Sequence, residues 1–261
     1  MISNVVATVF FPLRGIVEGG RRLLSLLLLC VCVEVLGQTC VPTATFYYTV
    51  VEDDVKKEQE EEAESYSGSA PVRGVFRANP EDADGYEARY EWKIYVPGQE
   101  ATPIVHRFEE TMEYTFMSSG TFIVELAATF VRGDDTVVYP EEGEEGTRFS
   151  VTVLESKLTM PNAFSPGNGD EMNNVYKVKE HESIISFKAT VFNRWGKKLY
   201  SWDDVDGCWD GKVGGKYVKD GVYFVNVVAK GADGHVYHIR KDINVLTGRL
   251  NEESGTTTEE P

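Results

Sequence analysis

The sequence is poor in the residues from which catalytic and metal centres are built. It has four histidines and four cysteines among 261 residues. His106 and His181 stand alone, and His235 and His238 lie three apart on an expected strand, which points them to opposite faces. No GxSxG, HExxH, P-loop or clustered Cys/His motif occurs. We therefore expect no enzyme activity, no cofactor and no such metal centre. A pair of catalytic carboxylates among the acidic residues is the enzymatic alternative.

Basic residues are also scarce. The chain has 26 Lys and Arg against 42 Asp and Glu, a net charge of −16 at pH 7. Nucleic acids and anionic membrane surfaces both require a basic face, so neither is an expected partner. The charge is unevenly spread: net +1 over residues 1–37, −16 over 38–156, +2 over 157–248 and −3 over 249–261. This change in character predicts two modules of different kinds.

Long apolar runs are nearly absent, and the one at 23–36 is short for a membrane span, which needs about 20 residues. Glu34 interrupts it, three arginines precede it and a glycine follows. The pattern predicts a secretory signal peptide over 1–37, with Gln38 as the new N-terminus and no transmembrane segment in the mature chain. Two alternatives remain open: a retained anchor helix and lipid attachment at Cys40.

Cleavage at this point would leave two cysteines, Cys40 and Cys208. An exported protein reaches an oxidising compartment, in which a disulfide persists. A disulfide between the two and a pair of unrelated thiols are both compatible with the sequence.

A strand-like run at 41–51 is followed by an acidic run at 52–64, which holds eight acidic groups and two lysines. Such a block repels itself, and we predict a mobile, solvated loop. Calcium binding is the alternative, although the spaced Asp/Asn/Gly pattern of a calcium loop is lacking.

Short strand-like runs separated by turn residues fill the rest of the first module. In one of them Val124, Leu126 and Ala128 alternate with residues of the opposite face. About seven such runs predict an immunoglobulin-like sandwich over 38–156. The runs are 71–78, 88–96, 104–108, 112–116, 121–131, 136–139 and 148–154.

The second module, residues 157–248, shows the same kind of pattern. Near its end Tyr237, Ile239, Ile243 and Val245 share one face, and polar residues share the other. We therefore predict an all-β chain of two tandem immunoglobulin-like β-sandwich domains, followed by a disordered acidic tail over 249–261. The expected strands of the second module are 158–164, 175–179, 184–193, 198–202, 222–230 and 235–245.

Three of the four tryptophans lie between residues 191 and 225, each beside turn residues. They are Trp195, Trp202 and Trp209. Large rings beside turns are typical of the open ends of a small β-sandwich, where the strand side chains run out. This connector therefore holds the candidate site of the second module.

The connectors hold five candidate residues with two interpretations. In the first, the plug interpretation, Trp195 and Trp209 fill the end of the sandwich. Asp210 then caps a turn and Gly211 supplies a positive φ. In the second, the same loops dock a partner, because Trp and Arg are frequent interface anchors. The five residues are Arg194, Trp195, Trp209, Asp210 and Gly211.

Four short motifs in the second module together resemble one family. They are PNAFSP at 161–166, FNRWG at 192–196, WDGK at 209–212 and DGVYF at 220–224. In this order and spacing they resemble the gliding-motility-associated C-terminal domain, the type B sorting domain of the type IX secretion system of Bacteroidetes. The resemblance covers 157–248.

The first module resembles a PKD-type domain through Trp92 in Tyr90-Glu91-Trp92 and the later YTF and SGTF sequences. It departs from that family at one turn, where WKIYVPG replaces the usual Trp-Asp-Phe-Gly-Asp-Gly.

The segment from Asn168 to Asn174, NGDEMNN, stands where the sorting domains often have Asn-Gly-Asp-Gly-x-Asn-Asp. Oxygen-bearing side chains at alternate positions could ligate Ca²⁺. Here Glu171 replaces the glycine and Asn174 the aspartate. We favour an Asx-rich turn, with Ca²⁺ as the alternative.

The sorting-domain resemblance implies export through the Sec machinery and then recognition by the type IX apparatus. It implies an outer-membrane β-barrel of the PorP/SprF type, with associated periplasmic secretion proteins, as partner. The expected location is the periplasmic face of the outer membrane or the cell surface. We expect a non-enzymatic structural accessory of the secretion and gliding machinery; the alternative is a small cell-surface adhesin, with the PKD-like module as cargo.

Overall fold

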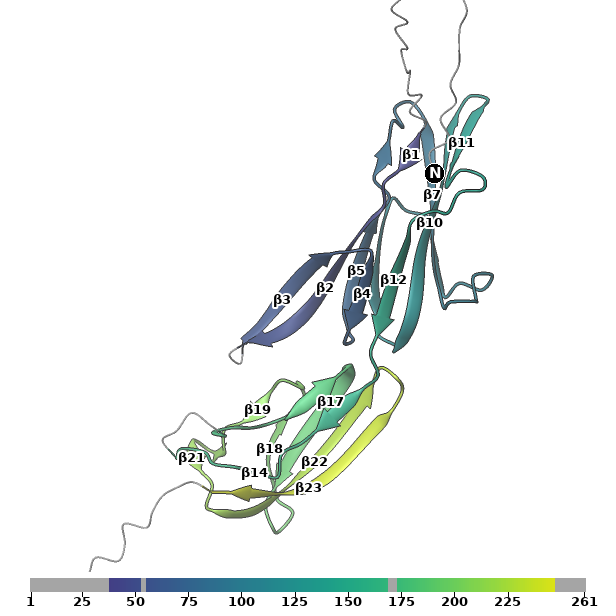
Figure 1. Ribbon diagram of the computed structural model, residues 1–261. Coiled ribbons are helices and arrows are strands. Elements are labelled where there is room, and N and C mark those ends of the chain that lie inside the picture. The colour runs from purple at the N-terminus through teal and green to yellow at the C-terminus, as the bar shows by residue number, and fades with distance from the viewer. Residues whose placement is uncertain (1–37, 53–54, 169–172, 247–261) are drawn as a thin grey trace, which may run out of the picture. The chain divides into compact units, whose positions relative to one another are not determined.

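The computed structural model describes residues 38–52, 55–168 and 173–246. Within these ranges every regular element is a β-strand, and no helix is present (Figure 1). It follows that the described part of the chain contains no helix able to cross a membrane. The all-β prediction is confirmed, whereas the predicted signal peptide and acidic tail lie outside the described residues.

The first module is a sandwich of two sheets. One has the strand order β4-β12-β10-β7-β8, with β11 also paired to β10, and the other has the order β3-β2-β5-β9. All neighbours are antiparallel except β4 and β12. Its strands are β1 (Thr39–Cys40), β2 (Thr43–Glu52), β3 (Val55–Glu62), β4 (Ser65–Gly68), β5 (Val72–Arg77), β6 (Pro80–Glu81), β7 (Glu87–Tyr95), β8 (Val105–Arg107), β9 (Thr111–Phe116), β10 (Gly120–Arg132), β11 (Asp135–Tyr139) and β12 (Arg148–Val153).

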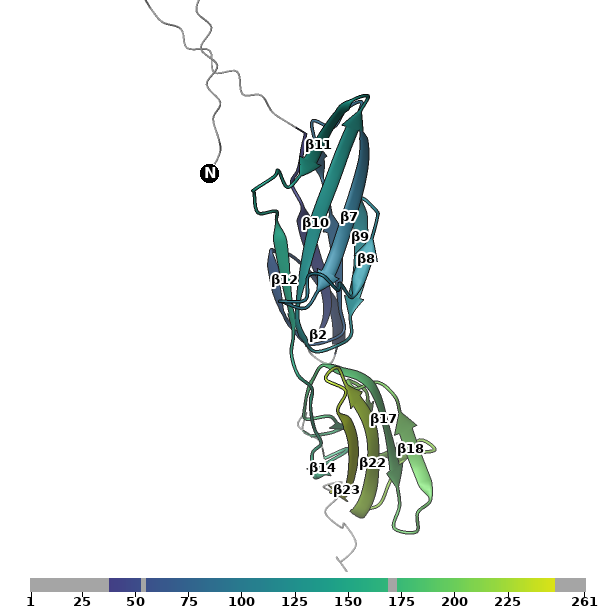
Figure 2. The same ribbon diagram turned by 90° about the vertical axis from the view of Figure 1, so that its right-hand side faces the viewer.

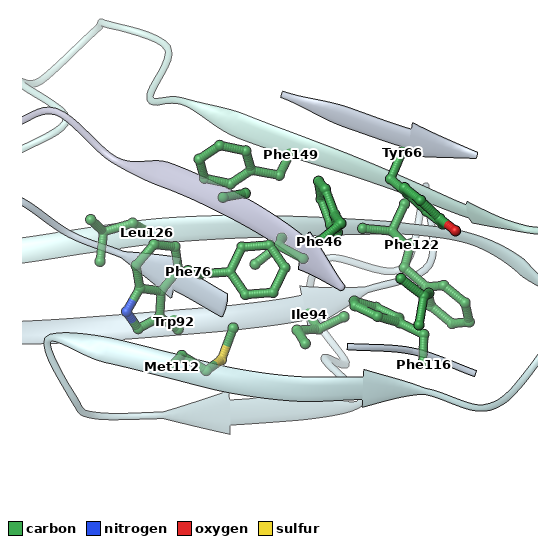
Figure 3. Packing of buried hydrophobic residues seen from close by; sticks show 14 of the residues in the cluster. Phe46, Tyr66, Phe76, Trp92, Ile94, Met112, Phe116, Phe122, Leu126 and Phe149 are labelled. Atoms are coloured by element: carbon green, nitrogen blue, oxygen red, sulfur yellow. The ribbon is translucent and has the colours of Figure 1, made fainter. Parts of the chain in front are cut away.

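Alternation along the long central strand β10 builds the core of this sandwich. Phe122, Val124 and Leu126 point inward, while the residues between them stay partly exposed. From the facing sheet Phe76 packs against Trp92, with ring centroids 6.0 Å apart, and both side chains are fully buried (Figure 3). The period-2 prediction is thus confirmed, because only a two-residue repeat keeps one face apolar.

The prediction of a loop over 52–64 is wrong. Val55–Glu62 forms strand β3, which pairs with β2 from Thr45 opposite Glu62 to Glu52 opposite Val55. Nearly all its side chains are exposed, so the carboxylates stay hydrated on both faces of an edge hairpin. Arg73 of β5, which lies on the other side of β2, is 3.6 Å from Glu58. The run of acidic residues indicated only that the segment is not buried. An edge strand needs backbone hydrogen-bond partners on one side and can carry charged side chains, so exposure did not exclude a strand.

The second module has one continuous sheet with the order β14-β23-β22-β17-β18 (Figure 2). Three strand pairs, β13 with β16, β15 with β19 and β20 with β21, complete it. Its strands are β13 (Lys157–Thr159), β14 (Ala163–Phe164), β15 (Tyr176–Lys177), β16 (Glu180–Glu182), β17 (Ile184–Phe192), β18 (Lys198–Trp202), β19 (Cys208–Trp209), β20 (Lys212–Val213), β21 (Lys216–Tyr217), β22 (Gly221–Gly231) and β23 (Val236–Val245).

One face of this sheet forms the core. Ile243 and Val245 of β23 are fully buried, and Asp242 and Asn244, which alternate with them, are exposed, as the alternation predicted. The expected single strand over 158–164 is instead two strands, β13 and β14. Pro161 lies between them and has no N–H to continue a ladder.

The candidate disulfide between Cys40 and Cys208 is not formed. Cys40 is a free cysteine of β1 that lies opposite Pro80 and is 5% exposed in the core of the first module. Cys208 lies on β19 of the second module and is exposed. The sequence could not show whether the two cysteines pair, because the distance between cysteines far apart in the chain depends on the fold.

The two cysteines should differ in reactivity. Burial, and secondarily the charge of Glu110, raises the pKa of the Cys40 thiol to about 12. Only about one thiol in ten thousand is then ionised near pH 8, and the thiolate is the nucleophile. We expect iodoacetamide to modify Cys208 about 100-fold faster than Cys40 in the folded chain, read by peptide mass spectrometry. The difference should vanish in denaturant; equal rates in the native protein would contradict the burial of Cys40.

Candidate docking surface

Three of the sequence motifs of the second module meet in its core. The Phe164 ring of PNAFSP packs against the Trp209 ring of WDGK, with centroids 5.3 Å apart. Trp209 is 0% exposed, and its Nε1 donates a hydrogen bond of 3.0 Å to the Lys212 carbonyl. Tyr223 of DGVYF packs edge-on against the same ring at 6.1 Å. The spacing of these motifs therefore reflects a single aromatic cluster.

Asp210 and Gly211 hold the turn that carries Trp209. The Lys212 amide donates to Asp210 Oδ1 at 2.9 Å, which caps the turn. Gly211 has φ of +76° and lies beneath Pro166, whose Cγ would be 2.7 Å from an added Cβ. These are the roles of the plug interpretation. The docking interpretation is wrong for Trp209, because a fully buried ring offers no surface to a partner.

Trp195 is the opposite case. Asn193 Oδ1 accepts hydrogen bonds of 3.0 Å from the amides of Trp195 and Lys197, and Gly196 adopts φ of +77°. This tight connection between β17 and β18 leaves Trp195 79% exposed. The Arg194 guanidinium lies 5.0 Å from its ring centroid. The plug interpretation is wrong for Trp195, and the docking hypothesis remains for it and for Arg194.

We call this exposed β17–β18 connection, with Arg194 and Trp195, the tip. The pairing of the strands shows which residues lie next to the tip on the same face of the sheet. We call the face opposite the Trp209 core the outer face. Its first row places Lys198 opposite Phe192, Phe192 opposite Phe224, and Phe224 opposite Asp242. We call this set the aromatic row. Phe224 is 44% exposed there, although a Phe ring normally seeks burial.

A polar row runs beside the aromatic row. Thr190 lies opposite Ser201 on one side and Asn226 on the other, and Asn226 lies opposite Arg240. The Thr190 and Ser201 hydroxyl oxygens are 3.4 Å apart. The outer face therefore offers apolar and hydrogen-bonding groups in adjacent rows, as a peptide-binding surface requires.

An open groove of about 670 Å³ is lined by part of each row and by Asn193, Arg194 and Gly196 of the β17–β18 connection. Phe192 and Phe224 form its apolar floor, and Arg194, Arg240 and Asp242 lie on its sides. A groove of this kind can hold a side chain of a partner, in contrast to a smooth sheet face.

Several basic residues of the outer face have no ion-pair partner in the part of the chain that the structure describes. Lys188, Arg194, Lys198 and Arg240 form no ion pair among the described residues, although Asp242 lies in the same groove. Other basic residues are paired; Arg148 of the first module, for example, lies 3.2 Å from Glu125, and Lys212 of the second lies 3.4 Å from Asp210.

The sequence argument missed Phe192, Phe224 and Arg240 as members of this surface. A pattern for Phe224 is present: β22 is apolar at both alternating sets of positions, and Val222, Phe224 and Val228 point outward. A strand covered on one face only should alternate, so the extra apolar residues indicate a second contact surface. Arg240 carries no such pattern and joins the surface only through the β22–β23 register.

The calcium alternative at Asn168 to Asn174 stays a prediction, since residues 169–172 lie outside the described ranges. No group of three or more potential metal-ligating His, Cys, Asp or Glu residues occurs in the described part of the chain.

Fold and surface together define a chain of two β-sandwich modules in which the second carries an exposed face with aromatic and basic side chains. Residues 158–249 match the family model of the CHU_C type IX secretion signal domain. The second module is therefore a type IX secretion signal domain, and the sorting-domain resemblance is confirmed. Such a signal implies an exported protein destined for the outer membrane or cell surface. The PKD-like resemblance of 38–156 stays a prediction.

No curated protein matches the chain. Two solved structures show weak similarity. The crystal structure of dimeric latent PorU from Porphyromonas gingivalis aligns with a TM-score of 0.24 and 12% identity, over 70% of this chain and 19% of that one. A putative membrane anchored protein from Corynebacterium diphtheriae aligns with a TM-score of 0.21 and 11% identity, over 85% of this chain and 61% of that one. The chain spans less than two thirds of either protein.

Proposed function

We propose that the protein is an exported, non-enzymatic accessory of the type IX secretion and gliding machinery. Its C-terminal module docks on an outer-membrane β-barrel of the PorP/SprF type and on the periplasmic secretion proteins associated with it. The observation that carries this proposal is the match of residues 158–249 to the type IX secretion signal domain.

The shape of the second module supports a docking role. Three of its four motifs contribute to the core, where Phe164, Trp209 and Tyr223 pack together. The recognition of a partner then falls to exposed groups, and the outer face with Arg194 and Trp195 supplies them. Exposed aromatic and arginine side chains are the usual anchors of such interfaces.

The test is co-purification from cells that have a type IX system. We expect the tagged full chain to bring down a β-barrel protein from detergent-solubilised outer membranes in near-equal amount, and a chain truncated after residue 156 to bring down none. A full chain that appears in the medium without a barrel would refute the accessory function.

A surface adhesin is the second candidate, and one observation in the first module favours it. Phe108 is 72% exposed and Ile104 is 51% exposed on either side of β8, with the His106 ring 4.5 Å from the Phe108 ring. An aromatic residue held in water is suited to ligand contact. In the same cells, removal of the first module by protease added outside, with loss of surface attachment, would support the adhesin over the accessory.

A further inference from the structure

We propose that the outer face of the C-terminal sheet binds an acidic, extended segment of a partner protein and takes one of its apolar side chains between Phe192 and Phe224. The inference rests on the proposed docking function and names the chemistry of the partner at that surface.

The aromatic row supplies the apolar part of the proposed binding surface. Phe224 and Val222 are 44% and 46% exposed on the outer face, and Phe192 lies directly opposite Phe224. Exposed apolar groups that are contiguous across neighbouring strands mark interaction sites, whereas scattered ones do not. A partner side chain seated on this row would remove both rings from water.

The positive charge at the groove favours an acidic partner. Arg194 and Arg240 border the groove, and neither has an acidic ion-pair partner among the described residues. A guanidinium binds a carboxylate through two parallel hydrogen bonds, which fixes direction as well as charge. Asp242 at the end of the aromatic row would repel a carboxylate there and so restricts the register of the bound segment.

The polar row is the reason that we expect the bound segment to be extended. Thr190, Ser201 and Asn226 lie next to the aromatic row and present hydroxyl and amide groups at strand spacing. Such groups can bond a polar backbone that runs along the rows. Trp195 at the tip adds a large, rigid contact at the end of the path.

A membrane surface is the competing occupant, because a tryptophan beside basic residues also suits a lipid interface. A bilayer would contact the protruding Trp195 and leave the groove unused. A protein segment uses the tip, both rows and the groove, so the observations favour it.

The probes are three fluorescently labelled peptides of about 12 residues. The first contains glutamate, tyrosine and glycine, the second has serine in place of tyrosine, and the third has lysine in place of glutamate. Binding to the full chain is measured by anisotropy. We expect the first to bind about tenfold more tightly than either of the others, and to weaken about fivefold when salt rises from about 0.05 to about 0.5 M.

Paired variants locate the binding. Arg194→Glu with Arg240→Glu should weaken binding of the first peptide about tenfold or more, and Phe224→Ser should weaken it similarly. The matched control is Lys216→Glu with Lys219→Glu, which makes the same charge change at exposed positions of the same module. It should change the affinity less than about twofold. Equal melting temperatures show that all variants are folded.

Three outcomes would overturn the proposal: preference for the lysine peptide, equal weakening by the control pair, or no loss with Phe224→Ser. Vesicles of phosphatidylcholine and phosphatidylglycerol that bind through Trp195 but not Phe224 would assign the surface to lipid instead.

The co-purification test separates this inference from the proposed function. If the Arg194/Arg240 variant still co-purifies with the barrel, docking stands and the surface assignment fails. If the wild-type chain binds the acidic peptide but no barrel, the surface stands and the docking function fails.

Discussion

Replacing Trp209 by alanine should lower the free energy of unfolding of the second module by about 3–5 kcal/mol. The indole is 0% exposed and packs against Phe164, Tyr200 and Tyr223. The substitution removes these contacts, leaves a cavity and deprives the Lys212 carbonyl of its donor. Chemical unfolding followed by circular dichroism measures the loss.

The matched control is Trp195→Ala, which removes the same side chain at a position that is 79% exposed. It should change the free energy of unfolding by no more than about 0.5 kcal/mol. Similar losses for the two variants would contradict the assignment of one ring to the core and the other to the surface. If Trp209→Ala left stability unchanged and only weakened barrel binding, the plug interpretation of this residue would fail.

Replacing Gly211 by alanine should lower the free energy of unfolding of the second module by about 2–4 kcal/mol. The residue has φ of +76°, and an added Cβ would lie 2.7 Å from Pro166 Cγ and 2.8 Å from Pro166 Cβ. Backbone strain and overpacking therefore add. Thermal and chemical unfolding of the folded variant measure the loss.

Gly215→Ala separates the two contributions. Gly215 has a similar φ of +80°, but nothing lies within 4 Å of an added Cβ. Its alanine variant should lose about 1 kcal/mol, from backbone strain alone. Equal losses at the two positions would show that the contact with Pro166 costs nothing. Pro166→Ala placed in the Gly211→Ala background should recover part of the loss, because it removes the Cγ atom.

These variants also separate folding from recognition in the second module. Trp209 and Gly211 of WDGK are buried, so their variants should lose stability before they lose binding. The outer-face residues are exposed, so Arg194 and Phe224 variants should lose binding at unchanged stability. A defect of both kinds at one position would place that residue at the border of the two regions.

The sequence by itself determined the positions of most long strands along the chain. Alternation placed β10 at 121–131 and β23 at 235–245 within one residue or so of their observed ends, and β18 at its observed 198–202. It could do so because half-buried antiparallel strands must repeat every two residues. The four motifs identified the secretion signal domain because each fixes a turn or an aromatic contact of one core.

The tertiary structure alone decided the properties that depend on neighbours from distant parts of the chain. Trp195 and Trp209 have the same side chain and similar turn residues beside them, yet one is solvent-exposed and the other fully buried. The acidic β3 is a strand because β2 offers it backbone partners, which no local pattern of charge records. Arg240 joins Phe192 and Phe224 only because the register of β17, β22 and β23 aligns them. Burial and adjacency are set by contacts between strands, and propensity along a single strand does not contain them.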